Sequence, residues 1–268
     1  MKVLCLGGSG GMGRFATKAI VEFKELEAIT VADLNKDAAE EFANSFDAKV
    51  QGIGLDVTDN KKLAEALKEH DVVLNTTGPF FMFGVPILKA AIENNCHYLD
   101  ICDDWEPTEE MLQLDSQAKD AEITAIIGLG ASPGITNLMG LVAMEELDSV
   151  DTVITGWDLS SVNPAEESSQ IGTNAAMLHG IQQMTGAVKI FEDGQLSMVQ
   201  SLKKLKIKYP GKGIYPANIF GHPEAISFPH HFPEIKNAMN VAHGSKALDI
   251  YIIKFLSSNH RVRYLIEP

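Results

Sequence analysis

The chain has 268 residues and a formal net charge of −14, from 22 basic and 36 acidic side chains. Such a surface repels phosphate backbones and anionic lipid, so we expect no nucleic-acid partner and no membrane partner. Three cysteines cannot form a disulfide framework and match no zinc-ligand spacing, which favours a reducing, cytoplasmic location and no metal. No apolar run approaches the roughly 20 residues that cross a bilayer, and the N-terminal run is too short for a signal peptide.

Short apolar runs alternate with amphipathic segments through the first half of the chain. This pattern predicts strands at 3–6, 28–32, 50–55, 72–75, 98–101 and 124–127. It predicts helices between them, at 12–26, 36–46, 60–69 and 84–94. Alternation at this spacing is typical of a doubly wound parallel sheet with helices on both faces, which is an α/β Rossmann fold.

The spacing changes after Gly134. Strand-like segments follow at 150–157, 205–209, 214–217, 225–228 and 261–265, and a hairpin is expected at 188–199. A helix is expected at 174–184, and either a helix or a strand at 247–256. The hairpin has Asp193-Gly194 at its turn. We therefore expect a dinucleotide-binding domain at 1–130. A second α+β domain with a mixed or antiparallel sheet is expected at 131–268, shortened at its C-terminus, for substrate binding or dimerisation.

A glycine-rich turn between the first strand and the first helix carries the sharpest signal. Gly8, Gly10 and Gly13 fit the spacing G-x-G-x-x-G. In dinucleotide-binding folds the first glycine permits a tight turn, the second leaves room for a pyrophosphate, and the third allows close packing of helix on strand. The helix N-terminus then offers unpaired N–H groups to the phosphates. The expected phosphate-binding residues are Gly8, Ser9, Gly10, Gly11, Met12 and Gly13.

Asp33 ends the second strand, at the distance from the glycines where such folds place an acidic residue. A carboxylate there accepts the ribose hydroxyls of NAD and repels the 2′-phosphate of NADP, so NAD is the expected cofactor. NADP stays open because Arg14 and Lys36 are near in sequence. The alternative is an ordinary aspartate that caps the next helix.

Two further turns follow strands at the same predicted edge of the sheet. Asp56 and Val57 follow the third strand, where this fold places the adenine, although a helix cap explains Asp56 equally well. A polar turn that ends the fourth strand is expected to contact the nicotinamide ribose, the alternative being a buried turn held by side-chain hydrogen bonds. Its residues are Asn75, Thr76, Thr77, Gly78 and Pro79.

The segments Asn75-Thr76-Thr77-Gly78-Pro79-Phe80, with Gly84 after it, and His97-Tyr98-Leu99-Asp100 resemble the saccharopine dehydrogenase (saccharopine reductase) family. Gly130-Ala131-Ser132-Pro133-Gly134 and Gly221-His222-Pro223-Glu224 fall where that family carries similar segments. The resemblance implies NAD(P)-linked oxidation of a C–N bond, or reduction of an imine, on amino-acid or polyamine substrates. Lysine dehydrogenases and carboxynorspermidine dehydrogenases are related members. It also implies a second domain that often dimerises, and hence a homodimer.

Several polar residues are candidates for handling the substrate. Asp100 follows a strand and can pair with a substrate ammonium, and Tyr98 points to the same side of that strand. His97 or His222 can exchange a proton near neutral pH. The turn at Ser132, Pro133 and Gly134 can offer backbone amides to the substrate, or act only as a hinge. For the histidines and the tyrosine, the alternative is a purely structural hydrogen bond.

The sequence lacks the motifs of two other classes of enzyme. Tyr and Lys four residues apart, which a short-chain dehydrogenase needs, do not occur, and the only Gly-Lys pair is followed by glycine, which excludes a Walker loop. Only three arginines are present, which disfavours substrates that bear several carboxylates, such as saccharopine. A Rossmann carbonyl reductase and a non-catalytic dinucleotide sensor or regulatory protein remain as alternatives. The acidic pairs at 103–104 and 109–110 are expected on a solvated face.

Overall fold

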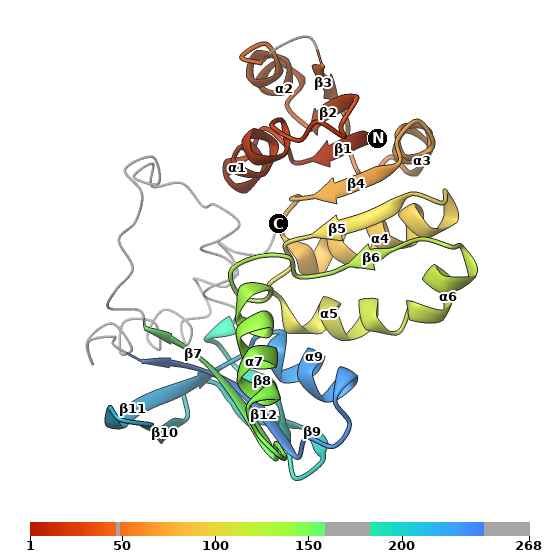
Figure 1. Ribbon diagram of the computed structural model, residues 1–268. Coiled ribbons are helices and arrows are strands. Elements are labelled where there is room, and N and C mark those ends of the chain that lie inside the picture. The colour runs from red at the N-terminus through yellow and green to blue at the C-terminus, as the bar shows by residue number, and fades with distance from the viewer. Residues whose placement is uncertain (47–48, 159–182, 244–268) are drawn as a thin grey trace. The chain divides into compact units, whose positions relative to one another are not determined.

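The computed structural model describes residues 1–46, 49–158 and 183–243, which form two compact units (Figure 1). The first unit is Met1–Cys102 with Glu106–Ala131. The second is Asp103–Trp105 with the chain from Ser132 onward. The segments predicted at 174–184, 247–256 and 261–265 lie wholly or mostly outside the described residues.

A six-stranded parallel sheet forms the centre of the first unit (Figure 1). Its strands are β1 (Lys2–Leu6), β2 (Ala28–Asp33), β3 (Val50–Gly54), β4 (Val72–Asn75), β5 (His97–Asp100) and β6 (Ala125–Ile126). Their order across the sheet is β3-β2-β1-β4-β5-β6, and every neighbouring pair is parallel. This is the strand order of a doubly wound dinucleotide-binding fold, so the predicted fold class is confirmed.

Helices cover both faces of this sheet. They are α1 (Gly11–Ile20), α2 (Lys36–Ala43), α3 (Asn60–Lys68), α4 (Phe80–Glu93), α5 (Trp105–Leu112) and α6 (Asp115–Asp120). Two apolar cores form because successive side chains of a strand point to opposite faces of the sheet, as β1 shows. Leu4 and Leu6 belong to one buried apolar cluster, while Val3 and Cys5 belong to the other.

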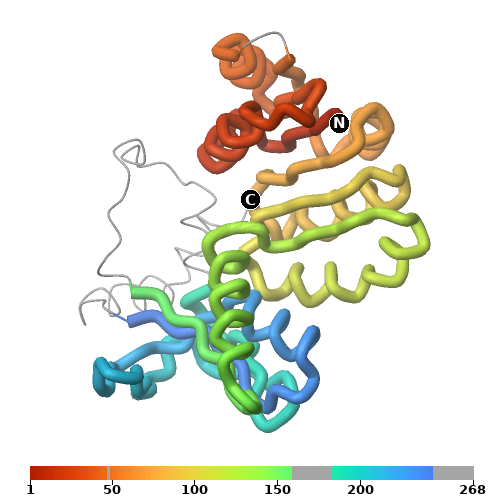
Figure 2. Tube along the Cα trace, viewed as in Figure 1, coloured from red at the N-terminus to blue at the C-terminus, as the bar shows by residue number. Residues whose placement is uncertain are grey.

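The described part of the second unit contains a mixed sheet and the helices α7 (Ile135–Glu145) and α9 (Glu224–His231). Its strands are β7 (Thr152–Asp158), β8 (Ala187–Glu192), β9 (Gln195–Gln200), β10 (Lys204–Tyr209), β11 (Gly213–Phe220) and β12 (Asn237–His243). The order is β10-β11-β12-β8-β9, and β7 also pairs with β12, in parallel. Figure 2 follows the chain through this sheet, in which β7 and β12 run side by side although they are distant in sequence. The predicted hairpin is present, with positive φ at both Asp193 and Gly194.

The strand predicted at 225–228 is wrong, because these residues lie in α9. Ala225, Ile226 and Phe228 are all buried, and three apolar residues in a run of four do not distinguish a buried strand from a buried helix. Pro223, with φ of −60°, already has the backbone conformation that starts a helix.

Other boundaries differ from the sequence predictions. The first helix ends at Ile20 instead of continuing to residue 26, and α4 begins at Phe80, four residues earlier than expected. The helices α5, α6 and α7 and the strand β12 were not predicted. Asp104 is only 1% exposed, so the interpretation of 103–104 as a solvated face is wrong for this residue.

Two general features complete the fold. Within residues 1–46, 49–158 and 183–243, no helix is both long enough and apolar enough to cross a membrane. The same ranges hold no group of three or more His, Cys, Asp or Glu side chains placed to bind a metal ion.

Candidate functional site

The order of the strands in the first unit reverses between β1 and β4, and ligands of open α/β sheets bind outside the carboxyl ends of the strands at such a point. At this point the last residue of β1 is hydrogen-bonded to the residue that follows β4. The backbone N–H of Thr76 donates to the carbonyl of Leu6 at 2.9 Å, and its hydroxyl donates to the same carbonyl at 2.8 Å. The glycine-rich loop and the polar turn after β4, both predicted as site residues, therefore lie next to each other.

Two of the motif glycines are required by close packing. A Cβ on Gly13 would lie 2.2 Å from the carbonyl oxygen of Gly7, and one on Gly8 would lie 2.8 Å from the carbonyl oxygen of Cys5. Real Cβ atoms do not approach backbone atoms so closely, so a side chain at either position would force the helix and the strand apart. These contacts support the packing role that the sequence spacing predicted for Gly13.

The middle of the loop has space. A Cβ on Gly10 would meet only the carbonyl oxygen of Gly7, at 3.2 Å, and one on Gly11 would meet no described atom within 4 Å. Gly10 is the N-cap of α1 and supplies no side-chain cap. The first N–H groups of α1 are thus left for an external acceptor, and the partial positive charge of a helix N-terminus favours a phosphate there.

Asp33 points toward this loop. Its Oδ2 accepts a hydrogen bond from the Ser9 hydroxyl at 2.7 Å, and its Oδ1 accepts from the backbone N–H of Asn35 at 3.2 Å. The next helix is capped instead by Asn35, whose Oδ1 accepts from the N–H of Ala38. The alternative role of Asp33 as the cap of α2 is therefore wrong.

The two basic residues that left NADP open already have partners. The Nε of Arg14 donates to the carbonyl of Ser9 at 2.7 Å, and its guanidinium lies 4.6 Å from the ring centroid of Phe42. Lys36 forms an exposed ion pair with Glu40 at 3.3 Å.

Asp56 forms a local turn at the end of β3. Its Oδ1 accepts hydrogen bonds from the backbone N–H and the hydroxyl of Thr58, at 2.9 and 2.7 Å, and these bonds lower the pKa of the carboxyl. The cap of α3 is Asp59, so the helix-cap alternative for Asp56 is also wrong. Val57 packs partly buried against one apolar core.

The turn after β4 contains one anchored side chain and one unpaired hydroxyl. Asn75 is buried, accepts from the N–H of Thr77 at 3.0 Å and donates to the phenol oxygen of Tyr98 at 3.1 Å. The hydroxyl of Thr77 is buried and has no hydrogen-bond partner in the described part of the chain. Gly78-Pro79 is a cis peptide. A buried hydroxyl without a partner fits a site where a ligand completes the hydrogen bond.

Tyr98 and Asp100 lie together, both fully buried. The Tyr98 hydroxyl donates to Oδ2 of Asp100 at 2.7 Å, while Oδ1 accepts from the N–H groups of Cys102 and Gly128 at 3.0 and 2.7 Å. Burial, followed by the charge of Asp100, raises the pKa of Tyr98 well above its usual value. These bonds tie the end of β5 to the segment after β6. The ring Nδ1 of His97 accepts from the N–H of Thr124, which also joins neighbouring segments.

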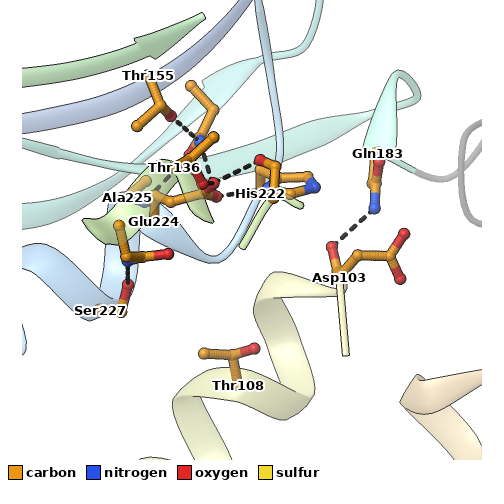
Figure 3. Close-up of polar contacts among 12 residues, drawn as sticks. Asp103, Thr108, Thr136, Thr155, Gln183, His222, Glu224, Ala225 and Ser227 are labelled. Atoms are coloured by element: carbon orange, nitrogen blue, oxygen red, sulfur yellow. Dashed lines mark hydrogen bonds and ion pairs between the residues drawn. The ribbon is translucent and has the colours of Figure 1, made fainter. Parts of the chain in front are cut away.

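The second unit holds a buried polar cluster that surrounds Glu224 (Figure 3). Its Oε1 accepts from the hydroxyls of Ser132 and Thr136, both at 2.5 Å. Its Oε2 lies 2.5 Å from Nδ1 of His222 and accepts from Nδ2 of Asn240 at 2.9 Å. Burial alone would raise the pKa of Glu224, but the hydrogen bond and charge of His222, with the two hydroxyls, lower it to about 2. Glu224 is thus an ionised carboxylate inside the unit.

This cluster brings together Ser132 and His222, two residues proposed from the sequence on separate grounds. Ser132 also accepts from the indole N–H of Trp157 at 2.9 Å. Gly134, with φ of 117°, caps α7 and donates its N–H to Asn137. Sequence reasoning missed Glu224, although it stands two residues after His222 in a segment that carried the family resemblance.

The strand order, the glycine loop at the switch point and the carboxylate turned toward it are features of a Rossmann fold, the class of fold that binds dinucleotides in many proteins. Residues 3–126 match the family described as the saccharopine dehydrogenase NADP binding domain. The resemblance read from the sequence is confirmed.

Relatives extend the similarity beyond this domain. A carboxynorspermidine synthase from Vibrio alginolyticus is 22% identical over 91% of this chain and 63% of its own length. A saccharopine dehydrogenase (NADP⁺, L-glutamate-forming) from Pyricularia oryzae is 27% identical over 76% of this chain and 46% of its own. The solved structure of apo saccharopine dehydrogenase (L-Glu forming) from Saccharomyces cerevisiae matches with a TM-score of 0.61 and 21% identity, over 90% of this chain and 54% of that one. The chain thus spans about half to two thirds of the length of these proteins, and the structural likeness concerns the fold.

Proposed function

We propose that the protein is an NAD(P)-dependent dehydrogenase or reductase that acts on a CH–NH group of an amino acid or a polyamine. The observation that carries the proposal is the arrangement at the N-terminus of α1. The first N–H groups of this helix have no side-chain cap, and there is open space at Gly10. The carboxylate of Asp33 is hydrogen-bonded to Ser9 of the same loop. A bound nicotinamide would supply the hydride acceptor or donor. The chain's own residues bind and orient the two reactants.

Three groups would hold the dinucleotide. The N–H groups of Gly11 and Met12 face the diphosphate, Asp33 accepts the ribose hydroxyls, and the unpaired hydroxyl of Thr77 serves the nicotinamide end. The name of the matching family refers to NADP, whereas we propose that this protein prefers NAD. It is supported by the negative charge of Asp33 and by the existing partners of Arg14.

The names of the relatives support the proposed substrate class. Their names include carboxynorspermidine synthase, saccharopine dehydrogenase and, in a Synechocystis strain, carboxyaminopropylagmatine dehydrogenase. Of the predicted catalytic residues, the geometry favours His222, whose Nε2 has no partner among the described residues. Tyr98 and Asp100 are bonded to each other. Substrate binding by Ser132, Pro133 and Gly134 stays part of the proposal.

We also propose a homodimer in the cytoplasm. One face of α7 exposes four apolar side chains at helical spacing, Ile135, Leu138, Met139 and Val142, and an apolar patch of this kind is typical of an interaction surface. The three cysteines are buried and none forms a disulfide bond, as suits a reducing compartment. Light scattering after size-exclusion chromatography tests the dimer, which predicts a mass of twice 29.1 kDa.

The test of function is a turnover assay. The purified chain is mixed with NAD⁺ or NADP⁺ and a panel of amines that includes L-lysine, norspermidine and saccharopine, and reduced nicotinamide is followed by absorbance. The matching ketones with reduced cofactor form a second panel. Turnover on amines supports the proposal, turnover on ketones alone indicates a carbonyl reductase, and binding without turnover indicates a sensor.

A further inference from the structure

The hydrogen bonds around Glu224 have fixed directions. The indole N–H of Trp157 donates to the hydroxyl oxygen of Ser132, which leaves the Ser132 proton for Glu224. The Oδ1 of Asn240 accepts from the N–H of Ala225, which leaves its amide N–H groups for Glu224 and Thr155. Donors therefore meet both carboxylate oxygens, and Glu224 acts only as an acceptor.

This arrangement decides where His222 carries its proton. The contact between Nδ1 and Oε2 of Glu224 joins a ring nitrogen to an acceptor, so Nδ1 must hold a hydrogen. In the neutral ring, Nε2 then carries the lone pair.

The other ring nitrogen of His222, Nε2, provides a second and independent observation about this residue. The residue is 0% exposed, and within the described ranges its Nε2 has no hydrogen-bond partner. Figure 3 shows this nitrogen on the side of the ring that faces away from Glu224. The rings of Trp157 and Phe220 pack close to the imidazole, at centroid distances of 5.1 and 5.3 Å. A buried polar atom without a partner costs stability, so its retention indicates a use.

We propose that Glu224 is a positioning residue, which keeps the proton of His222 on Nδ1 and the ring in one orientation so that Nε2 can accept a hydrogen bond from a substrate amine. The last step rests on the proposed function. When the His222 ring is neutral, the pair carries the charge of the Glu224 carboxylate, about −1, which favours an ammonium donor.

The protonation of His222 can be measured without any substrate. The protein is labelled with ¹⁵N-histidine, and the ring resonances of His222 are assigned among the eight histidines by their loss in His222→Asn. The proposal expects a proton on Nδ1 and a bare Nε2 at a pH where the ring is neutral. A ring with its proton on Nε2 and a bare Nδ1 would overturn the proposal.

Variants of Glu224 separate positioning from simple packing. Glu224→Gln should populate the second tautomer and lower kcat by about tenfold or more, while the Kd for NADH stays unchanged. Glu224→Asp keeps a carboxylate, so it should retain the proton on Nδ1 of His222 and more of the activity than Glu224→Gln does. Glu192→Gln, an exposed site in the same unit, is the matched control and should change neither readout. If Glu224→Gln folds and His222 keeps the same tautomer, Glu224 does not fix the position of the proton. If that variant does not fold, the wild-type spectrum decides whether the proton of His222 is on Nδ1.

A final arm tests the amine. The amine that the wild type turns over is added with oxidised cofactor, and the Nε2 resonance of His222 is expected to shift. An unmoved resonance at saturating amine would refute the contact. If no amine is turned over, the proposed function and the amine contact fail together, while the tautomer spectrum still decides the role of Glu224.

Discussion

The hydroxyl of Ser9 donates to a carboxylate oxygen of Asp33 across 2.7 Å, which joins the glycine loop to the end of β2. The residue proposed to accept the ribose hydroxyls is therefore held against the loop proposed to receive the diphosphate. A bound dinucleotide would exchange or share this hydrogen bond, since a ribose hydroxyl donates to a carboxylate as a serine hydroxyl does.

Asp33→Ala should narrow the preference for NAD over NADP. The change removes an acceptor for the ribose hydroxyls and also removes the charge that repels a 2′-phosphate. A hydrogen bond to a charged group contributes about 1.5–3 kcal/mol, so the ratio of the two Kd values should shift by roughly tenfold or more. Titrations with NADH and NADPH, followed by nicotinamide fluorescence, measure this ratio.

The control for Asp33 is Glu41→Ala, which removes an exposed carboxylate from α2 in the same unit. It should leave the ratio unchanged. An equal ratio in the wild type and in Asp33→Ala would exclude Asp33 from cofactor selection.

Gly13→Ala and Gly11→Ala should differ sharply in stability. The added methyl group at Gly13 would lie 2.2 Å from the carbonyl oxygen of Gly7, whereas at Gly11 it would meet no described atom within 4 Å. We expect Gly13→Ala to lower the free energy of unfolding by about 1–3 kcal/mol, and Gly11→Ala to leave it unchanged or raise it by up to about 1 kcal/mol. Urea unfolding followed by far-ultraviolet circular dichroism compares the two, and similar midpoints would contradict the packing role of Gly13.

Glu224 should make the stability of the second unit depend on pH in the acid range. Its pKa is lowered from 4.5 to about 2 in the folded chain, so its contribution is present above about pH 4.5 and is lost as the pH falls toward 2. Between about pH 7 and about pH 3, the wild type should lose on the order of 2 kcal/mol more than Glu224→Gln.

Tryptophan fluorescence isolates this effect, because both tryptophans, Trp105 and Trp157, belong to the second unit. Urea titrations of the wild type and Glu224→Gln at the two pH values give the difference. Parallel losses of stability in the two proteins would mean that the carboxyl is not held in its ionised form.

The cysteines should resist alkylation in the folded protein. Burial raises the pKa of the Cys5 thiol to about 12, and burial together with the charge of Asp71 does the same for Cys96. The reactive thiolate is therefore scarce at about pH 8. Mass spectrometry after iodoacetamide should show little labelling of either residue until urea unfolds the chain, and rapid labelling without urea would disprove their burial.

The first unit was predictable because its signals are local. The glycine spacing, the strand before it and Asp33 after it all lie within about 30 residues, and steric limits on glycine act through near neighbours. The predicted ends of helices were less accurate. Phe23 was assigned to α1 from its spacing, but it lies beyond the end of the helix and is 54% exposed.

The cluster in the second unit could not be predicted, because its partners are far apart in the chain. Ser132 and Thr136 reach Glu224 across 92 and 88 residues, and no local pattern records such a contact. For Asp100 the sequence predicted the position in the fold but not the hydrogen-bond partners. The sequence placed it correctly at the end of a strand, but only the structure shows that both of its oxygens accept hydrogen bonds from neighbouring groups.

The most direct test of the dinucleotide site is isothermal titration of NADH into the wild type, Gly10→Val and Ala19→Val. The last variant adds the same side chain to an exposed position of the same helix. The valine at residue 10 would fill the space in front of the helix N-terminus, so binding should be lost in Gly10→Val and kept in the wild type and Ala19→Val. Equal NADH affinity in all three folded proteins would contradict a diphosphate site at the glycine loop.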